Sequence, residues 1–319
     1  VQKLQGDQDM FMPSRFRSAL AILLVAPFCA MAENPAERPW SLRPVVRPPI
    51  PVANPDGWAR NPIDQFILAR IEKEKLEPAA EADRYTLVRR LYLDLIGLPT
   101  LPEEFDSFTG DPHHDAHERL VDRLLASPHH GERWGRYWLD LARFADTNGY
   151  NIDLRRPIWP YRDWVIESFN RNQRFDDFTI EQLAGDLLPD RKFDTQVATG
   201  FNRNHRINSE AGSIPDEWIV EYVADRVETM GTMFLGLTLT CSRCHNHKYD
   251  PITQKDYYSL SAYFNNVDEA GLYSWFTNSV PTPTLELGQL PNDAKIRAAE
   301  VDLQRNVQSA ATRKAFHTR

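Results

Sequence analysis

Two cysteines and a histidine stand close together in the segment Cys241-Ser242-Arg243-Cys244-His245. Two thiols about one helical turn apart can add to the two vinyl groups of a haem, and an imidazole next to the second thiol can bind the iron from the same side. This spacing predicts a covalent haem c site. Cys241 and Cys244 would be the attachment residues, and His245 would be the proximal iron ligand.

The same side chains allow other kinds of site. The two thiolates with His245 or His247, and with Asp250, would give a tetrahedral zinc site. A redox-active cysteine pair is another alternative, although its usual setting of alternating strands and helices is absent from the sequence pattern. A disulfide or an inert cysteine pair is the last alternative. We expect haem, and we take zinc as the first alternative.

The distal iron ligand is marked less clearly than the proximal one. Small cytochromes c use a methionine downstream of the motif, but the last methionine of this chain precedes the motif. The sixth ligand would therefore be an upstream side chain, a downstream histidine, a residue in a C-terminal continuation of the chain, or water. The candidates within the sequence are Met230, Met233, His205, His247 and His317.

Residues 1–32 include the layout of a secretory signal peptide. From Met10 or Met12 the chain passes two arginines, enters the apolar stretch 19–28 and reaches the small-residue segment Ala30-Met31-Ala32. The apolar stretch is shorter than the roughly 20 residues of a membrane span. We therefore expect an exported protein, periplasmic or extracellular, with no stable membrane span. Attachment of c-type haem outside the cytoplasm agrees with this compartment.

Composition limits the classes of function. The chain has 319 residues, of which 42% are hydrophobic, so it can build a substantial core. Its formal net charge of -8 argues against a nucleic-acid partner, which needs a concentrated basic face. Removal of the signal peptide would leave Cys241 and Cys244 as the only cysteines, which is not the pattern of a disulfide scaffold.

Helical periodicity dominates the sequence after a proline-rich lead-in at residues 33–60. The predicted fold class is mainly α, an irregular multi-helix domain with long loops and not a small class I cytochrome c fold. We place this domain at 61–267. Residues 268–319 would be a linker, or an edge strand near 280–287, followed by a charged helix at 291–316 that begins a truncated downstream domain. Apolar spacing predicts helices over 61–71, 83–97, a short stretch from 102, 116–125, 134–141, 161–169, 215–234 and 256–264.

The middle of the chain is rich in aromatic residues. Their helical spacing over 134–141 and 161–169 favours core packing. A carbohydrate-binding surface, or a hydrolase or lyase that uses Asp146, Asp153 or Asp163 on a polysaccharide, is the alternative. No pair of carboxylates has diagnostic spacing, so a general acid and base cannot be assigned. We expect the polar loop 146–151 to be a structural turn.

Several long segments are distinctive enough to indicate a family. The chain resembles the planctomycete cytochrome C-like domain of unknown function over residues 40–267. The segments that carry the resemblance are Asn61-Pro62-Ile63-Asp64, Leu93-Asp94-Leu95-Ile96-Gly97-Leu98-Pro99, Gly131-Glu132-Arg133-Trp134-Gly135-Arg136, Ala145-Asp146-Thr147-Asn148-Gly149-Tyr150, Tyr161-Arg162-Asp163-Trp164-Val165 and the stretch from Cys241 to Pro251.

The resemblance implies an exported protein named for its C-x-x-C-H element and without an agreed activity. A second domain of unknown function usually follows in that family, often with a carbohydrate-binding-like insert between the two. Some relatives also carry a small separate cytochrome c domain, but this sequence has no second C-x-x-C-H. A single haem cannot form an internal relay, so electron transfer would need a redox partner protein.

Overall fold

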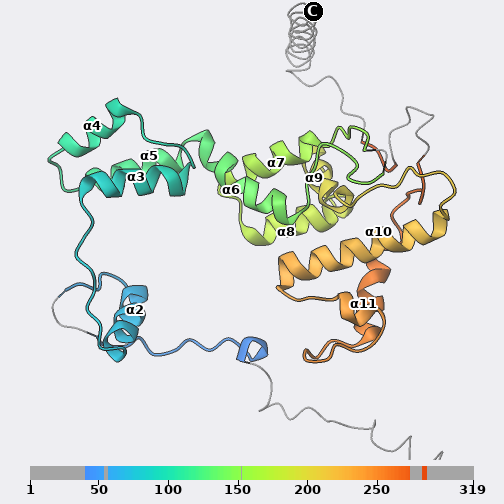
Figure 1. The fold of residues 1–319 in the computed structure, drawn as a ribbon, viewed down its shortest axis with the longest axis horizontal. Coiled ribbons are helices and arrows are strands. Elements are labelled where there is room, and N and C mark those ends of the chain that lie inside the picture. Colours follow the sequence, from blue (N-terminus) through green and yellow to red (C-terminus); the bar gives the residue numbers. More distant parts are fainter. Residues whose placement is uncertain (1–39, 54–56, 152, 274–281, 286–319) are drawn as a thin grey trace, which may run out of the picture. The chain divides into compact units, whose positions relative to one another are not determined.

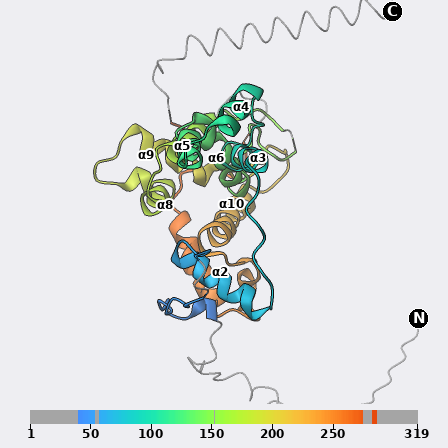
Figure 2. The same ribbon diagram turned by 90° about the vertical axis from the view of Figure 1, so that its left-hand side faces the viewer.

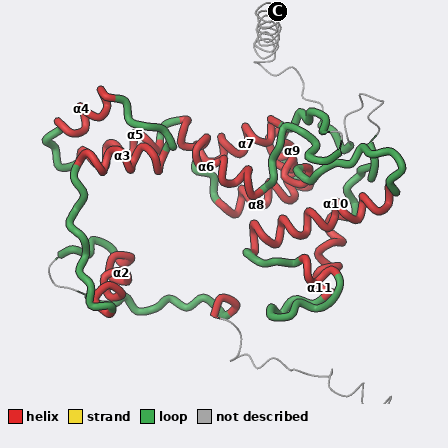
Figure 3. Tube along the Cα trace, in the orientation of Figure 1, coloured by secondary structure: helices red, strands yellow, loops and turns green. Residues whose placement is uncertain are grey.

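The computed structural model describes residues 40–53, 57–151, 153–273 and 282–285 (Figure 1). In these ranges every regular element is a helix and no strand forms (Figure 3). One isolated antiparallel bridge there joins Thr147 and Arg155. The prediction of a mainly α, irregular multi-helix fold is therefore confirmed. None of the described helices is long and apolar enough to cross a membrane.

Some predicted segments lie outside the described residues. These are the signal peptide within 1–32, the helix expected at 291–316 and the candidate ligand His317. Within the segment 280–287, residues 282–285 are described, and they form a bend and no strand. The domain boundaries given above stay predictions.

The chain divides into two compact units, the first ending at Glu81 and the second beginning at Ala82. The first contains the short 3-10 turn Trp40–Leu42 and helix α2 (Pro62–Lys73). The Asn61 side chain accepts a hydrogen bond from the Asp64 backbone N–H at 3.0 Å, and the Asp64 carboxylate accepts one from the Asn61 N–H at 3.2 Å. This reciprocal cap confirms the helix start that Asn61-Pro62 predicts.

The second unit begins with three helices around one small core. They are α3 (Arg84–Leu95), α4 (Pro102–Gly110) and α5 (Ala116–Leu125). Asp83 caps α3 by accepting from the Thr86 N–H at 2.7 Å. Gly97 follows the helix with a φ of 73°, a conformation that favours glycine. The buried side chains that join the three helices are Val88, Tyr92, Ile96, Phe108, Ala116, Leu120 and Leu124.

The main core packs α6 (Pro128–Leu141) against α7 (Trp159–Asn170), which lie side by side in Figure 1. The close approach depends on Gly131, because a Cβ there would stand 2.3 Å from the Ile166 carbonyl oxygen. As the spacing predicts, Tyr161 and Trp164 are buried, whereas Trp134 is 40% exposed. Further helices complete this core: α8 (Phe175–Ala184), Gly185–Leu187, α9 (Phe193–Ala198) and Thr199–Arg203.

Helix α10 (Pro215–Met230) leads into the cysteine motif, as predicted. A π-helical turn, Gly231–Leu235, extends it, and Gly236 ends that turn with a φ of 64°. The motif turn Thr240–Arg243, helix α11 (Gln254–Ser261) and the turn Ala262–Phe264 follow. Figure 2 shows α10 from a second direction. A third core joins α10 to these elements through Val223, Val227, Leu239, Tyr257 and Phe264.

Candidate functional site

The predicted haem-attachment residues lie on one tight turn. The Cys241 carbonyl oxygen accepts from the backbone N–H groups of Cys244 and His245, both at 3.4 Å. Between the cysteines, Ser242 is fully buried and its N–H donates to the Leu239 carbonyl at 2.9 Å. Burial of this one residue directs its neighbours outward, so the turn presents its functional side chains to solvent.

Both thiols are exposed and form no disulfide. His245 is also exposed, and its Nδ1 lies 2.8 Å from the Asn246 carbonyl oxygen. A carbonyl accepts only, so Nδ1 carries the hydrogen and Nε2 keeps its lone pair free. Cys241, Cys244 and His245 therefore lie on one exposed turn, and no hydrogen bond within the described residues engages His245 Nε2.

Two helices hold the motif turn in place. From α11, the Tyr258 hydroxyl and the Gln254 side-chain amide donate to the Arg243 carbonyl oxygen at 3.0 and 3.2 Å. From α10, Glu221 forms an ion pair with the Arg243 guanidinium at 2.5 Å. The hydrogen bond from Arg243 lowers the pKa of Glu221, so the pair is ionised at neutral pH. The turn is thus anchored on both sides, although its sequence alone specifies only its spacing.

The alternative zinc ligands are not gathered around one point. His247 Nδ1 accepts from the Asp250 backbone N–H at 2.9 Å, and it also lies 3.3 Å from an Asp250 carboxylate oxygen. This arrangement closes the loop after the motif. In the part of the chain that the structure describes, no group of three or more histidine, cysteine or acidic side chains could hold a metal ion.

The candidate distal ligands lie in different surroundings. Met233 packs against the main core, and Met230 packs against the core beneath the motif. His205 is buried, and its Nε2 accepts from the Arg226 guanidinium at 2.9 Å. Since His247 is committed to its own loop through Nδ1, the described residues place no candidate as an evident sixth ligand.

A second cluster, centred on Arg226, was not expected from the sequence. The Arg226 guanidinium makes two contacts with the Glu269 carboxylate, at 2.6 and 2.7 Å, and both side chains are 2% exposed. The Arg203 guanidinium reaches the same carboxylate at 3.3 Å. His205 belongs to the same group, because its Nε2 accepts from Arg226, and its Nδ1 donates to the Arg206 backbone carbonyl at 2.8 Å. We call the side chains of Arg203, His205, Arg226 and Glu269 the Arg226 cluster.

Burial and charge shift the ionisation of this cluster. Burial lowers the pKa of His205 to about 4, so its ring is neutral at pH 7. Burial alone would raise the pKa of Glu269, but the hydrogen bonds and the positive charge of Arg226 outweigh that effect and lower it to about 2. The cluster therefore ties the chain around residue 269 to α10 through an ionised carboxylate and a neutral histidine.

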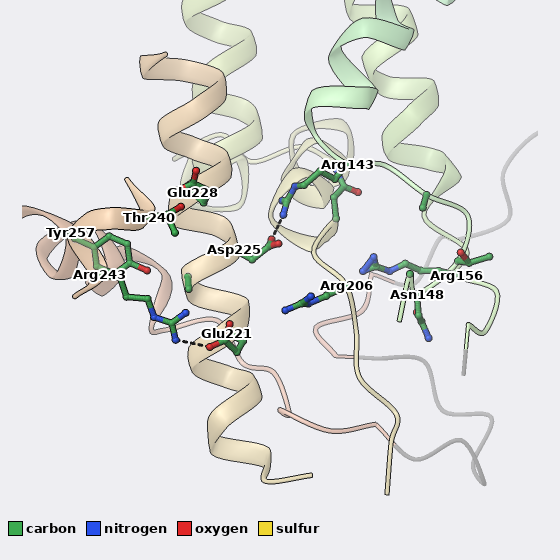
Figure 4. A pocket seen from close by; sticks show the side chains of 15 residues that line it. Arg143, Asn148, Arg156, Arg206, Glu221, Asp225, Glu228, Thr240, Arg243 and Tyr257 are labelled. Atoms are coloured by element: carbon green, nitrogen blue, oxygen red, sulfur yellow. Dashed lines mark hydrogen bonds and ion pairs between the residues drawn. The ribbon is translucent and has the colours of Figure 1, made fainter. Parts of the chain in front are cut away.

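A polar pocket of about 480 Å³ lies beside the motif turn (Figure 4). Helix α10 stands between the motif turn and two loops, one after α6 and one after the 3-10 turn Thr199–Arg203. Sequence reasoning missed this pocket, although Glu221, Asp225 and Glu228 recur on α10 at helical spacing as a signal. Its lining residues are Arg143, Ala145, Thr147, Asn148, Gly149, Arg156, Asn204, Arg206, Glu221, Ala224, Asp225, Glu228, Thr240, Arg243 and Tyr257.

The aspartates of the carbohydrate alternative have separate local partners. Asp153 accepts from the Gly149 N–H at 2.7 Å, and this bond lowers the pKa of its carboxyl group. The Asp146 backbone carbonyl accepts from the Arg156 N–H at 2.7 Å. The side chain of Asp163 is ion-paired with its neighbour Arg162 at 2.7 Å. The contacts of Asp146 and Asp153 turn the chain at loop 146–151, and the same loop places Asn148 and Gly149 in the lining of the pocket.

Fold and site together define a mainly helical protein with an exposed C-x-x-C-H turn anchored between two helices. The family model PSCyt2, described as a protein of unknown function (DUF1549), matches residues 62–269. The chain belongs to this family. No curated protein and no solved structure matches the chain.

Proposed function

We propose that this chain binds haem c covalently and serves in electron transfer or another redox reaction. Cys241 and Cys244 would form the thioether bonds, and His245 would be the proximal iron ligand. One observation carries the proposal: two unpaired, exposed thiols share a turn with an exposed imidazole whose Nε2 is free. The donor set fits a haem c, which when bound supplies a one-electron redox centre.

The surrounding residues have supporting roles in this proposal. The Asn246 carbonyl, 2.8 Å from Nδ1, orients the His245 ring and raises the basicity of Nε2 as an outer-shell partner does in metal sites. The bonds to the Arg243 carbonyl from Gln254 and Tyr258 keep the spacing between the thiols constant. We propose that water or a residue outside the described ranges would complete the iron's ligands, because Met230 and Met233 pack against cores and His205 Nε2 and His247 Nδ1 have other partners.

Export of the chain is part of the same proposal. Within residues 1–32, two arginines are followed by an apolar stretch and then by small residues, which is the layout of a secretory signal. Export would agree with the attachment of haem c, which takes place outside the cytoplasm. Electrons would then pass to a separate redox protein in that compartment. A fusion of residues 10–40 to a reporter that is active only after export tests this point, and an inactive fusion would refute export.

The decisive test is whether haem stays attached after denaturation. The full chain is produced in cells that attach haem c, denatured, and assayed as a pyridine haemochrome. We expect one covalent haem per chain, and none when Cys241 and Cys244 are both changed to alanine. His245→Ala is expected to alter the iron ligation spectrum, whereas the matched variant His247→Ala leaves it unchanged. A wild-type chain without covalent haem, or one with stoichiometric zinc instead, would overturn the proposal.

A further inference from the structure

The pocket beside the motif turn contains an unusual concentration of buried polar atoms without partners. Asn148 and Asn204 are each 4% exposed, and both line the pocket. The Asn148 Oδ1 and both polar atoms of the Asn204 amide have no hydrogen-bond partner among the described residues. Arg143 Nε and Glu228 Oε2 are also buried atoms without a hydrogen-bond partner among these residues. A buried polar atom without a protein partner must pair with water or with a ligand, so five such atoms around one pocket mark it as a polar binding site.

The chemistry of these atoms restricts the ligand. Asn148 Oδ1, Asn204 Oδ1 and Glu228 Oε2 accept hydrogen bonds, whereas Asn204 Nδ2 and Arg143 Nε donate them. A simple oxyanion only accepts, so it would leave the three oxygens unsatisfied. Hydroxyl groups both donate and accept. Several hydroxyl groups on one small molecule would serve all five atoms.

The charges around the pocket add a second requirement. Two pairs neutralise each other, Arg143 with Asp225 and Arg243 with Glu221, as the dashed lines in Figure 4 show. None of the carboxylates in the described part of the chain forms an ion pair with Arg156 or Arg206. Because Glu228 is the remaining acidic side chain of the lining, one positive charge is left over.

Both unpaired guanidinium groups are held in position by other means. Arg156 is 7% exposed and donates to the His205 and Arg203 carbonyl oxygens, and burial lowers its pKa to about 10. Arg206 lies over the rings of Tyr150 and Trp218, 5.4 and 5.6 Å from their centroids. Side chains fixed in this way are prepared to meet an anionic group without further ordering.

We infer that this pocket binds a small polyhydroxylated carboxylate, that is, a sugar acid. Its hydroxyl groups would pair with Asn148, Asn204 and Glu228, and its carboxylate would balance the excess charge of Arg156 and Arg206. The volume of about 480 Å³ lies within the range of small-molecule pockets. This site is independent of haem, although Arg243 belongs both to the pocket and to the motif turn.

Isothermal titration of the purified full chain with D-glucuronate, D-glucose and acetate tests the inference. We expect glucuronate to bind as one molecule per chain. Glucose lacks the charge and acetate lacks the hydroxyl groups, so each is expected to bind at least about tenfold more weakly. No glucuronate binding up to roughly 10 mM, or glucose binding as tightly as glucuronate, would overturn the inference.

Variants locate the binding in this pocket. Arg206→Ala should weaken glucuronate binding about tenfold, since it removes a guanidinium group that would face the ligand's carboxylate. Arg206 is exposed, so its replacement should leave the fold intact. Arg136→Ala is the matched control, because Arg136 is also exposed and lies 5.8 Å from a tyrosine ring centroid. Equal weakening by Arg136→Ala would refute the location.

Discussion

The motif turn and the Arg226 cluster use similar numbers of reactive side chains in opposite ways. Cys241, Cys244 and His245 come from one turn and are exposed to solvent. Arg226 and Glu269 are 43 residues apart and are each 2% exposed. The exposed turn keeps its groups free to react, whereas the buried cluster consumes its groups in mutual contacts. In this protein, the ionisable groups that meet through tertiary contacts are buried and stabilise the fold. The groups of the motif turn, which are close in the sequence, stay exposed and available for reaction.

Arg226→Met should give the largest effect, because it leaves the buried Glu269 carboxylate without its main partner. We expect the free energy of unfolding to fall by about 3–5 kcal/mol, measured by urea denaturation. Arg119→Met, which removes exposed pairs with Asp111 and Asp115, is the control and should cost less than about 1 kcal/mol. If both variants lost the same unfolding free energy, the buried ion pair of Arg226 would be no more important for stability than an exposed one.

Acid should weaken the cluster through two successive protonations. The unfolded chain takes up a proton on His205 near pH 6.5 and on Glu269 near pH 4.5, whereas the folded chain resists until about 4 and about 2. The unfolded state therefore binds more protons throughout this range, and stability falls as pH drops from 6.5 towards 2. Each group should contribute about 3 kcal/mol to the loss.

A variant isolates the histidine part of that pH dependence. His205→Asn removes the group that titrates between pH 6.5 and 4, so its unfolding free energy should change less over that window than that of the wild type. Urea denaturation at a series of pH values measures the slope. His129→Asn, at an exposed position beside Glu132, is the control. An unchanged slope in His205→Asn would contradict the assignment.

Replacement of both motif cysteines should give the smallest effect on the haem-free chain. Cys241→Ala with Cys244→Ala removes exposed thiols that make no disulfide, so the free energy of unfolding should change by less than about 0.5 kcal/mol. Ser242→Val is the contrasting change, since Ser242 is fully buried between them. It should cost about 1–3 kcal/mol through overpacking. A large loss in the double cysteine variant would show that the thiols support the fold.

Local signals predicted much of the fold. The Asn61-Pro62 start of α2 and the glycine stop at Gly97 depend on neighbouring backbone groups, so residue type alone marks them. Helices α8 (Phe175–Ala184) and α9 (Phe193–Ala198) were not predicted, and the six residues of α9 are too few to show a clear period. The polar pocket was missed for a different reason: Asn148, Asn204 and Glu228 are far apart in the sequence, and only packing brings them together.

The sequence by itself determined the helical class, the capped starts of α2 and α3, and the order of Cys241, Cys244 and His245, because these depend on contacts within a few residues. Tertiary structure alone decided that Ser242 is buried, that the thiols point outward, and that α10 separates the motif turn from the polar loops. It also decided which arginines find a carboxylate. Arg226 does so through Glu269, whereas Arg206 rests on two aromatic rings. Such pairings depend on side chains meeting in three dimensions, and no local spacing encodes them.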